Sequence, residues 1–325
     1  MMATAVLREV MKAGLDLPVG PEAERLVRFI TEAFGPSTAA VIHYGSRAQG
    51  SGSRPESAYD FFVILDDYDE AFRSFVERIQ PRFTAQSAIL LSRILPPSVV
   101  AVTTTSSMGE REMAKCAVLS MRDFIIACSA NSPDQFTKGR LFQQVQLAWV
   151  RDPSSRVQVE EGVIAARLAT FEWGRHYMPE SFDVETFCRT LLSTSYAGEV
   201  RPETRARIDE LFSAQSDIML QMYSALLAEF ARQGLLERAG DAYRQTRLPT
   251  RLERARMRLY FRRSKMRATL RWGKHVWLYD DWLEYVKHKV ERRSGVVIVL
   301  TPRERRWPFV FLWPKVFRFL RSRSQ

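Results

Sequence analysis

The apolar residues among the first 122 positions follow two different periods. In 21–34 and 72–79 they recur every three or four residues, which predicts amphipathic helices, and Pro21 suits the first turn of the earlier one. Short, largely apolar runs rich in β-branched and aromatic residues, between turn-forming residues, predict four strands at 39–44, 59–65, 98–105 and 115–120. Helices and strands mixed in this way predict an α+β domain with a small mixed sheet over residues 1–122.

Beyond residue 122 the helical period dominates. Three stretches carry apolar residues at this spacing: 163–174, 184–196 and 206–236. They predict a second, mainly helical domain over residues 123–240. The remaining segment, 241–325, mixes aromatic and basic residues, and we expect it to form a basic amphipathic C-terminal tail.

The charge of the chain lies mostly in that tail. The chain has 325 residues, 46% of them apolar, which is enough to bury a core in two domains. Its net charge is +11, but residues 244–325 alone hold 23 Lys and Arg against 6 Asp and Glu. Such a segment indicates an anionic partner, either nucleic acid or a lipid surface. The three cysteines form neither a metal-binding nor a disulfide pattern, so we expect a reducing compartment. The N-terminal residues do not resemble a targeting peptide, and no apolar run is long enough to span a membrane.

A Gly-Ser pair, Gly45 and Ser46, follows the first predicted strand. Glycine lets backbone N–H groups approach a phosphate closely, and a carboxylate on the neighbouring strand could hold Mg²⁺ against the same phosphates. Asp60 stands at the start of that neighbouring strand, and Ala58 stands two positions before it. The plainer alternatives are an ordinary Gly-Ser turn and an Asp that caps a strand.

Five stretches resemble, in the same order and at similar separations, those of the mitochondrial type of phosphatidate cytidylyltransferase (CDP-diacylglycerol synthase) and its bacterial relatives. They are YGSRAQG (44–50), YDFFVILDD (59–67), AKCAVLSMRDFI (114–125), KGRLFQQV (138–145) and TSYAGEVRPE (194–203). That family resembles the DNA polymerase beta nucleotidyltransferase superfamily, in which Gly-Ser is followed by Asp-x-Asp. Here Ala58 takes the first Asp position, and these cytidylyltransferases also have an apolar residue before a single Asp. Gln143 and Gln144 stand where the family usually has Lys-Pro.

The resemblance implies a nucleotidyltransferase-like fold and a Mg²⁺-dependent reaction, in which CTP and phosphatidic acid give CDP-diacylglycerol and pyrophosphate. The nucleotide-binding residues that it implies are Tyr44, Gly45, Ser46, Lys115 and Arg140. The implied catalytic residues are Asp60, which is also the metal ligand, Lys115 and Arg201. The implied acceptor-binding residues are Tyr196, Glu199 and Arg201.

Each of these roles has a plainer alternative. Lys115 could be a solvated surface lysine, Arg140 an arginine on a helix surface, and Glu199 with Arg201 an ion pair in a helix-capping loop. Two other functions are also open. One is a nucleotidyltransferase for another acceptor, such as a small molecule or an RNA end. The other is a catalytically inactive module that binds a nucleotide or nucleic acid.

The last twenty residues interleave aromatic and basic side chains, which is typical of a segment that lies among lipid headgroups. The residues that we expect to contact an anionic membrane are Trp307, Phe309, Phe311, Trp313, Phe317 and Arg318. Packing against the core and binding of nucleic acid are the alternatives, and the high apolar density of this segment argues against nucleic acid. We therefore expect a cytoplasmic protein, peripheral on the inner face of a bacterial-type membrane, or on the matrix side of the inner membrane if it is mitochondrial.

Overall fold

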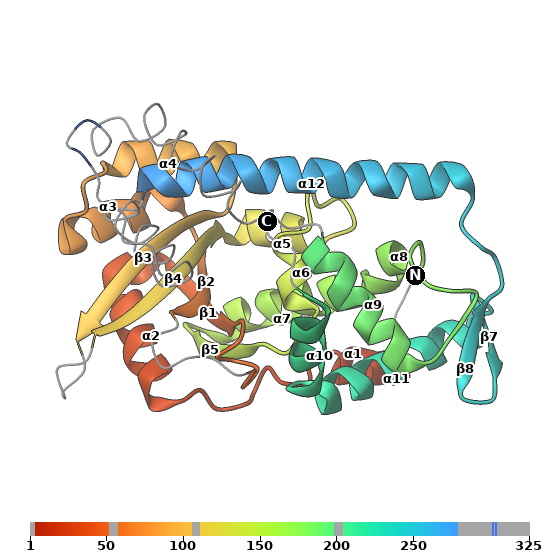
Figure 1. Ribbon diagram of the computed structural model, residues 1–325. Coiled ribbons are helices and arrows are strands. Elements are labelled where there is room, and N and C mark those ends of the chain that lie inside the picture. Colours follow the sequence, from red (N-terminus) through yellow and green to blue (C-terminus); the bar gives the residue numbers. More distant parts are fainter. Residues whose placement is uncertain are drawn as a thin grey trace. The chain divides into compact units, whose positions relative to one another are not determined.

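The computed structural model describes residues 4–51, 58–105, 111–197 and 204–278, together with Thr301 and Arg303. Residues 1–275 form one compact unit, and residues 276–325 form a second unit that lies almost entirely outside the described residues. The longer helices are α2 (Pro21–Phe34), α3 (Tyr68–Ile79), α4 (Ala85–Ile94), α5 (Met121–Cys128), α7 (Pro153–Leu168), α9 (Val184–Ala197), α10 (Arg205–Ser213), α11 (Ser216–Arg232) and α12 (Arg251–Leu278). Shorter helices are α1 (Ala5–Val10), the 3₁₀ turn η1 (Gly35–Ser37), α6 (Lys138–Leu141) and α8 (Thr170–Gly174). The predicted α+β class is confirmed (Figure 1).

A five-stranded mixed sheet forms the centre of the first half of the chain. Its strands are β1 (Thr38–Tyr44), β2 (Tyr59–Leu65), β3 (Ser98–Thr105), β4 (Arg111–Ser120) and β5 (Gln146–Val150), in the order β3-β4-β2-β1-β5. Strand β2 pairs parallel with β4, and the other three pairings are antiparallel. The four predicted strands are therefore confirmed, and β5 is an additional one.

Strand β5 and helix α12 differ from the predicted domain limits. Strand β5 takes an edge of the sheet from beyond residue 122, because α5 and α6 return the chain to the free side of β1. Helix α12 packs back onto residues before 240 instead of beginning a separate tail. Both differences arise from pairing between segments far apart in the sequence, which no local pattern reports.

Both faces of the sheet are covered, and this explains why its inner strands are largely apolar on both sides. Every residue of β1 is buried. Helix α2 packs on one face, where Phe34 stacks on Phe75 of α3 with ring centroids 4.7 Å apart. Helices α5 and α7 pack on the other face, against a cluster that includes Tyr44, Phe62 and Leu119. The end of β1 therefore lies within a rigid, packed framework.

The helical part of the chain has its own core, formed chiefly by α1, α8, α9, α10 and α11. The stretch 206–236, predicted as one helix, forms two, because Gln215 leaves the helical conformation at φ −133°. Helix α11 stops before Gly234, whose φ of +73° is left-handed. A small three-stranded sheet follows, made of β6 (Ser181–Phe182), β7 (Leu236–Ala239) and β8 (Ala242–Gln245).

A fully buried arginine, Arg167 of α7, joins the two cores. Its guanidinium donates to the carbonyl oxygens of Leu141 at 3.1 Å and Gln143 at 3.0 Å. It also donates to the carbonyl oxygens of Met11 and Ala13, just after α1. Burial lowers the pKa of Arg167 to about 10, so the group is still charged at neutral pH. Four backbone carbonyl oxygens therefore stabilise this buried charge.

Helix α12 lies along one side of the molecule and reaches α4 (Figure 1). Phe261 enters the helical core, and Ser264 accepts a hydrogen bond from the backbone of Gln135 at 2.9 Å. Further along, Lys274 contacts the segment between α4 and β3. Among the residues described, no helix is both long enough and apolar enough to cross a bilayer.

Candidate active site

The Gly-Ser turn directly follows the central strand β1. Gly45 has a φ of +83°, which favours glycine. A Cβ atom built on Gly45 would lie 3.0 Å from Oδ2 of Asp60 and 3.5 Å from its Cβ. Glycine is therefore needed here twice, for the conformation of the turn and for the close approach of the Asp60 side chain.

Three of the predicted site residues form a row across the sheet. Tyr44 of β1 stands opposite Asp60 of β2, and Asp60 stands opposite Lys115 of β4. Residues paired in this way point to the same face, and here it is the face covered by α5 and α7, because Tyr44 stacks on Phe62 at 4.4 Å between ring centroids. The carboxylate of Asp60 and the ammonium of Lys115 thus share one end of the sheet, beside the Gly-Ser turn.

Arg140 approaches the same face from helix α6. Its guanidinium carbon lies 3.9 Å from the ring centroid of Phe136 and 5.9 Å from that of Tyr44. Nη1 donates to the carbonyl oxygen of Phe136 at 2.8 Å. These contacts hold a permanent positive charge over the end of β1. Lys138, two residues earlier, is instead buried with Nζ 5.5 Å from the ring centroid of Tyr260 on α12.

A network of buried amide side chains holds the segment after the Gly-Ser turn. Gln49 donates to Oε1 of Gln143 at 3.1 Å, and Gln215 donates to the same oxygen at 3.3 Å. Gln143 in turn donates to the carbonyl oxygen of Gly139 at 2.9 Å, and Gln144 donates to that of Ala48 at 3.1 Å. Gln143 is therefore the centre of this network, at a position where the family that the sequence resembles usually has Lys-Pro. The sequence alone gave it no role.

The network reaches one predicted acceptor residue. The hydroxyl of Tyr196, near the end of α9, lies 3.5 Å from Oε1 of Gln143. Arg207 of α10 donates to the carbonyl oxygen of Ser51 at 3.2 Å, so the helical part also contacts the turn segment. Glu199 and Arg201 lie outside the described residues. The aromatic and basic residues predicted to contact a membrane, from 307 to 318, lie outside them as well.

Asp60 is the one carboxylate that the sequence assigns to Mg²⁺ at this turn. Among the described residues, no group of three or more His, Cys, Asp and Glu side chains is arranged to hold a metal ion. Mg²⁺ commonly binds through one or two carboxylates and completes its shell with substrate phosphates and water. The donor set around Asp60 therefore fits an ion that arrives with a nucleotide better than one held by the protein alone.

No protein-family model matches the chain, and no curated protein matches it significantly. Of the predicted nucleotide-binding residues, the fold brings Tyr44, Gly45, Lys115 and Arg140 to one end of the sheet, and Ser46 follows Gly45 in the same turn.

Proposed function

We propose that this protein is a phosphatidate cytidylyltransferase, which transfers the CMP group of CTP to phosphatidic acid and releases pyrophosphate. The observation that carries the proposal is the contact between the Gly45 turn and the Asp60 carboxylate, with Lys115 next to Asp60 on the adjoining strand. A glycine turn, one carboxylate and a nearby cation are the groups that a nucleotidyl transfer to a charged acceptor requires.

Each of these groups has a separate task. The turn at Gly45 and Ser46 offers backbone N–H groups to the triphosphate without a side chain in the way. Asp60 would hold Mg²⁺, which supplies neutralisation of charge on the phosphates when it is bound. Lys115 and Arg140 place two further positive charges near the same strand ends, where they would stabilise the leaving pyrophosphate.

A phosphate acceptor explains why a single carboxylate could suffice. An oxygen of phosphatidic acid forms the new bond to the α-phosphorus, and the bond between the α-phosphorus and the bridging oxygen breaks. A phosphomonoester is largely ionised at neutral pH, because its second pKa is about 6. The protein therefore need not remove a proton from the nucleophile, and positioning with charge neutralisation carries the reaction.

The test is cytidylyl transfer from CTP labelled at the α-phosphate to vesicles that contain phosphatidic acid, with Mg²⁺ present. We expect label in the lipid extract, and a loss of about 100-fold or more for Asp60→Asn. Asp67→Asn is the matched control, because Asp67 lies just beyond the far end of β2 and caps α3, where its Oδ1 accepts from the backbone of Asp69 at 2.6 Å. It should keep the activity.

Heat unfolding distinguishes the ways in which the test could fail. Stabilisation of the protein by CTP with Mg²⁺, but not by ATP, together with no lipid label, would indicate an acceptor other than phosphatidic acid. No stabilisation by either nucleotide would contradict nucleotide binding at the Gly45 turn altogether. Equal activity in Asp60→Asn and the wild type would exclude the role given to Asp60.

A further inference from the structure

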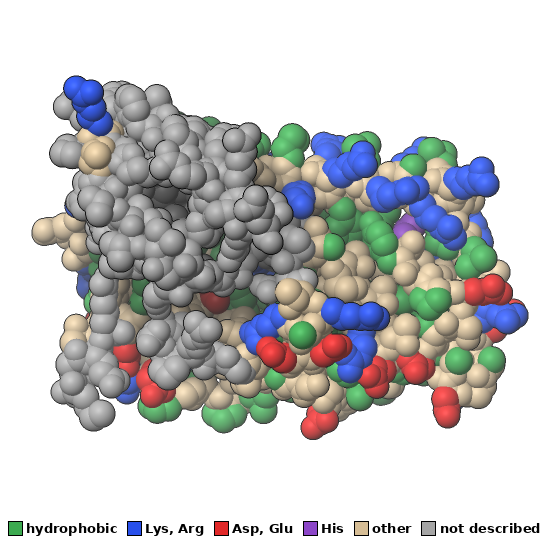
Figure 2. Space-filling view, in the orientation of Figure 1, with side chains coloured by type: hydrophobic (Ala, Val, Ile, Leu, Met, Phe, Trp, Pro, Cys, Tyr) green, Lys and Arg blue, Asp and Glu red, His purple; other side chains and the backbone are tan. Residues whose placement is uncertain are grey.

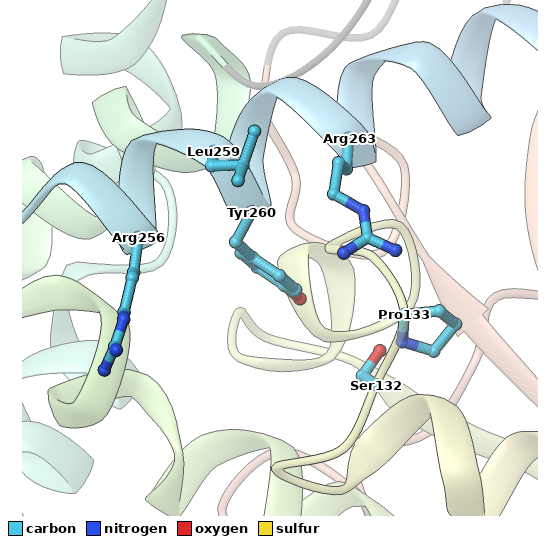
Figure 3. Close-up of a pocket in the computed structure, with 6 residues that line it drawn as sticks. All are labelled: Ser132, Pro133, Arg256, Leu259, Tyr260 and Arg263. Carbon is cyan, nitrogen blue, oxygen red and sulfur yellow. The ribbon is translucent and has the colours of Figure 1, made fainter. Parts of the chain in front are cut away.

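A pocket of about 310 Å³ lies between α12 and the loop that follows α5 (Figure 3). The residues that line it are Ser132, Pro133, Arg256, Leu259, Tyr260 and Arg263. The four from α12 are spaced at i, i+3, i+4 and i+7, which places them on one side of the helix. The pocket is separate from the Gly45 turn, since it contains none of the residues assigned to nucleotide transfer.

Two arginines that have no acidic partner among the described residues stand at this pocket. Arg256 and Arg263 are exposed, and neither guanidinium group makes a hydrogen bond or ion pair with any residue in the described part of the chain. The next two arginines on this side of α12 differ, because Arg267 and Arg271 both bind the buried carboxylate of Asp134. The pocket therefore presents two guanidinium groups that are available to an anion such as a phosphate.

The walls of the pocket are fixed and largely apolar. The hydroxyl of Ser132 donates to the carbonyl oxygen of Asp134 at 2.6 Å, and that of Tyr260 donates to Oε1 of Gln135 at 3.2 Å. Both hydroxyl protons are thus used inside the fold. Pro133, Leu259 and the ring of Tyr260 leave an apolar surface beside the two arginines. This combination suits a ligand that carries a phosphate on an apolar body.

The pocket adjoins a row of exposed apolar side chains on α12. Leu252, Leu259, Met266 and Leu270 are 60%, 56%, 59% and 58% exposed. Separations of seven, seven and four residues place them on nearly one line along the helix. The helix carries ten Lys and Arg and a single acidic residue, Glu253. Figure 2 shows Lys and Arg side chains with apolar ones between them along the part of α12 that is in view.

We propose that this outer face of α12 docks on an anionic phospholipid bilayer, with one lipid phosphate held between Arg256 and Arg263. Leu259 and its apolar neighbours on the row would enter the headgroup layer, while the surrounding basic residues meet other lipid phosphates. Nucleic acid would use the arginines but not exposed leucine and methionine side chains, since its binding sites favour flat aromatic rings. The choice of a lipid over free phosphate rests partly on the proposed reaction.

Flotation of the full chain with vesicles tests the site directly, without CTP or Mg²⁺. Vesicles of phosphatidylcholine with about one third phosphatidylglycerol should carry the protein upward, and pure phosphatidylcholine should not. The double variant Arg256→Gln, Arg263→Gln should weaken binding by about tenfold or more. The double variant Arg254→Gln, Lys265→Gln is the matched control: it removes the same charge at exposed positions of α12 that do not line the pocket, and should weaken binding about threefold at most.

A second pair of variants tests the apolar contact. Leu259→Gln should weaken vesicle binding about fivefold, because the side chain would enter the headgroup layer. Val157→Gln, which is 59% exposed on α7, should leave binding unchanged. All four variants change exposed residues, so equal heat stability serves as the check on folding.

Equal loss of binding in the two charge variants, or unchanged binding in Leu259→Gln, would overturn the proposal. Tighter binding to a single-stranded oligonucleotide than to the vesicles, with the same dependence on Arg256 and Arg263, would overturn it as well. Competition with free inorganic phosphate distinguishes the sources of the anion. Release of the protein from vesicles by millimolar phosphate at constant ionic strength would indicate a free-phosphate site and contradict docking. Vesicle binding without cytidylyl transfer would support docking by α12 and contradict the proposed reaction.

Discussion

Gly45 and Asp60 are packed so closely that a Cβ atom on the glycine would lie 3.0 Å from the carboxylate oxygen Oδ2. Contacts this short between a Cβ atom and a side-chain oxygen force one of the two to move. Because Gly45 begins the turn and Asp60 stands opposite Tyr44 on the paired strand, the backbone on both sides is held by the sheet. The side chain of Asp60 is the part that would be displaced.

Gly45→Ala should therefore abolish nucleotide binding, although it should lower the free energy of unfolding only modestly. Alanine at a φ of +83° costs about 1 kcal/mol in backbone strain, and it also moves Asp60. Gly50→Ala is the matched control, because Gly50 has a φ of +67° with no atom within 4 Å of a built Cβ. Both variants should lose similar heat stability, but only Gly45→Ala should lose stabilisation by CTP with Mg²⁺. Equal stabilisation in the two would show that the placement of Asp60 is irrelevant to the nucleotide.

Asp134→Asn should destabilise the protein strongly. The Asp134 carboxylate is 4% exposed and accepts from Nε of Arg267 at 2.8 Å, as well as from Arg271. Burial opposes its ionisation, but Arg271 and Arg267 outweigh burial and lower the pKa of Asp134. Its contribution is thus present at neutral pH and is lost only as the pH falls through the folded-state pKa. Removing one partner of a buried ion pair costs about 3–5 kcal/mol, measurable by urea unfolding at pH 7.

Asp69→Asn is the surface counterpart of that change. Asp69 pairs with Arg93, and their side chains are 36% and 57% exposed. Exposed pairs contribute about 1 kcal/mol or less, so this variant should unfold close to the wild type. A similar loss of unfolding free energy in Asp69→Asn and Asp134→Asn would contradict this. It would mean that the burial of Asp134 beneath α12 adds nothing to the stability that its ion pairs provide.

Arg167→Met should cost about 3 kcal/mol or more of the free energy of unfolding. The substitution leaves four carbonyl oxygens near two cores without their donor, and each buried polar group left unpaired costs about 1–3 kcal/mol. Arg156→Met is the control, since the Arg156 side chain is 40% exposed and pairs with Asp16 and Glu160 at the surface. It should cost about 1 kcal/mol or less. Denaturant unfolding of the two variants side by side checks the difference.

The parts of this fold that the sequence predicts are those with a local cause. The strands 39–44 and 59–65 are apolar except for His43 and Asp60, because both faces of the sheet are covered. The turn after Tyr44 needs glycine for a backbone angle. Such signals are contained within a few residues. The row from Tyr44 to Lys115 then follows once β2 and β4 lie side by side.

The parts that the sequence did not predict depend on partners far along the chain. Strand β5 has only five residues, and its run of four apolar residues is too short to distinguish a strand from a buried helix segment. Arg167 reads as an ordinary helix residue, because its four acceptors come from two segments that only the fold brings together. Gln143 likewise acquires its partners from Gln49 and Gln215, 94 and 72 residues away. A single sequence carries no trace of such pairings.

Lys274 should make the stability of the protein rise with pH over part of the alkaline range. Lys274 is 7% exposed, and its Nζ donates to the carbonyl oxygens of Leu95 and Pro97 and to Oγ of Ser98. These bonds hold α12 against the start of β3. Burial, with smaller contributions from Arg271 and Arg267, lowers the pKa of Lys274 to about 7. In the unfolded chain a lysine titrates near 10.4. Between these values the unfolded chain binds more protons, so this residue makes stability rise with pH.

The measurement compares Lys274→Met with the wild type by urea unfolding at pH 7.5 and pH 9. Burial raises the pKa of Cys116, Cys128 and Cys188, so these thiols make stability fall above about pH 8, but they do so equally in both proteins. The variant should be less stable at both pH values, because the acceptors of Lys274 lose their donor. The wild type should gain about 2 kcal/mol relative to the variant on going from pH 7.5 to pH 9. Parallel pH profiles would show that Lys274 keeps an ordinary pKa, which a buried amine held by uncharged acceptors and facing two arginines should not do.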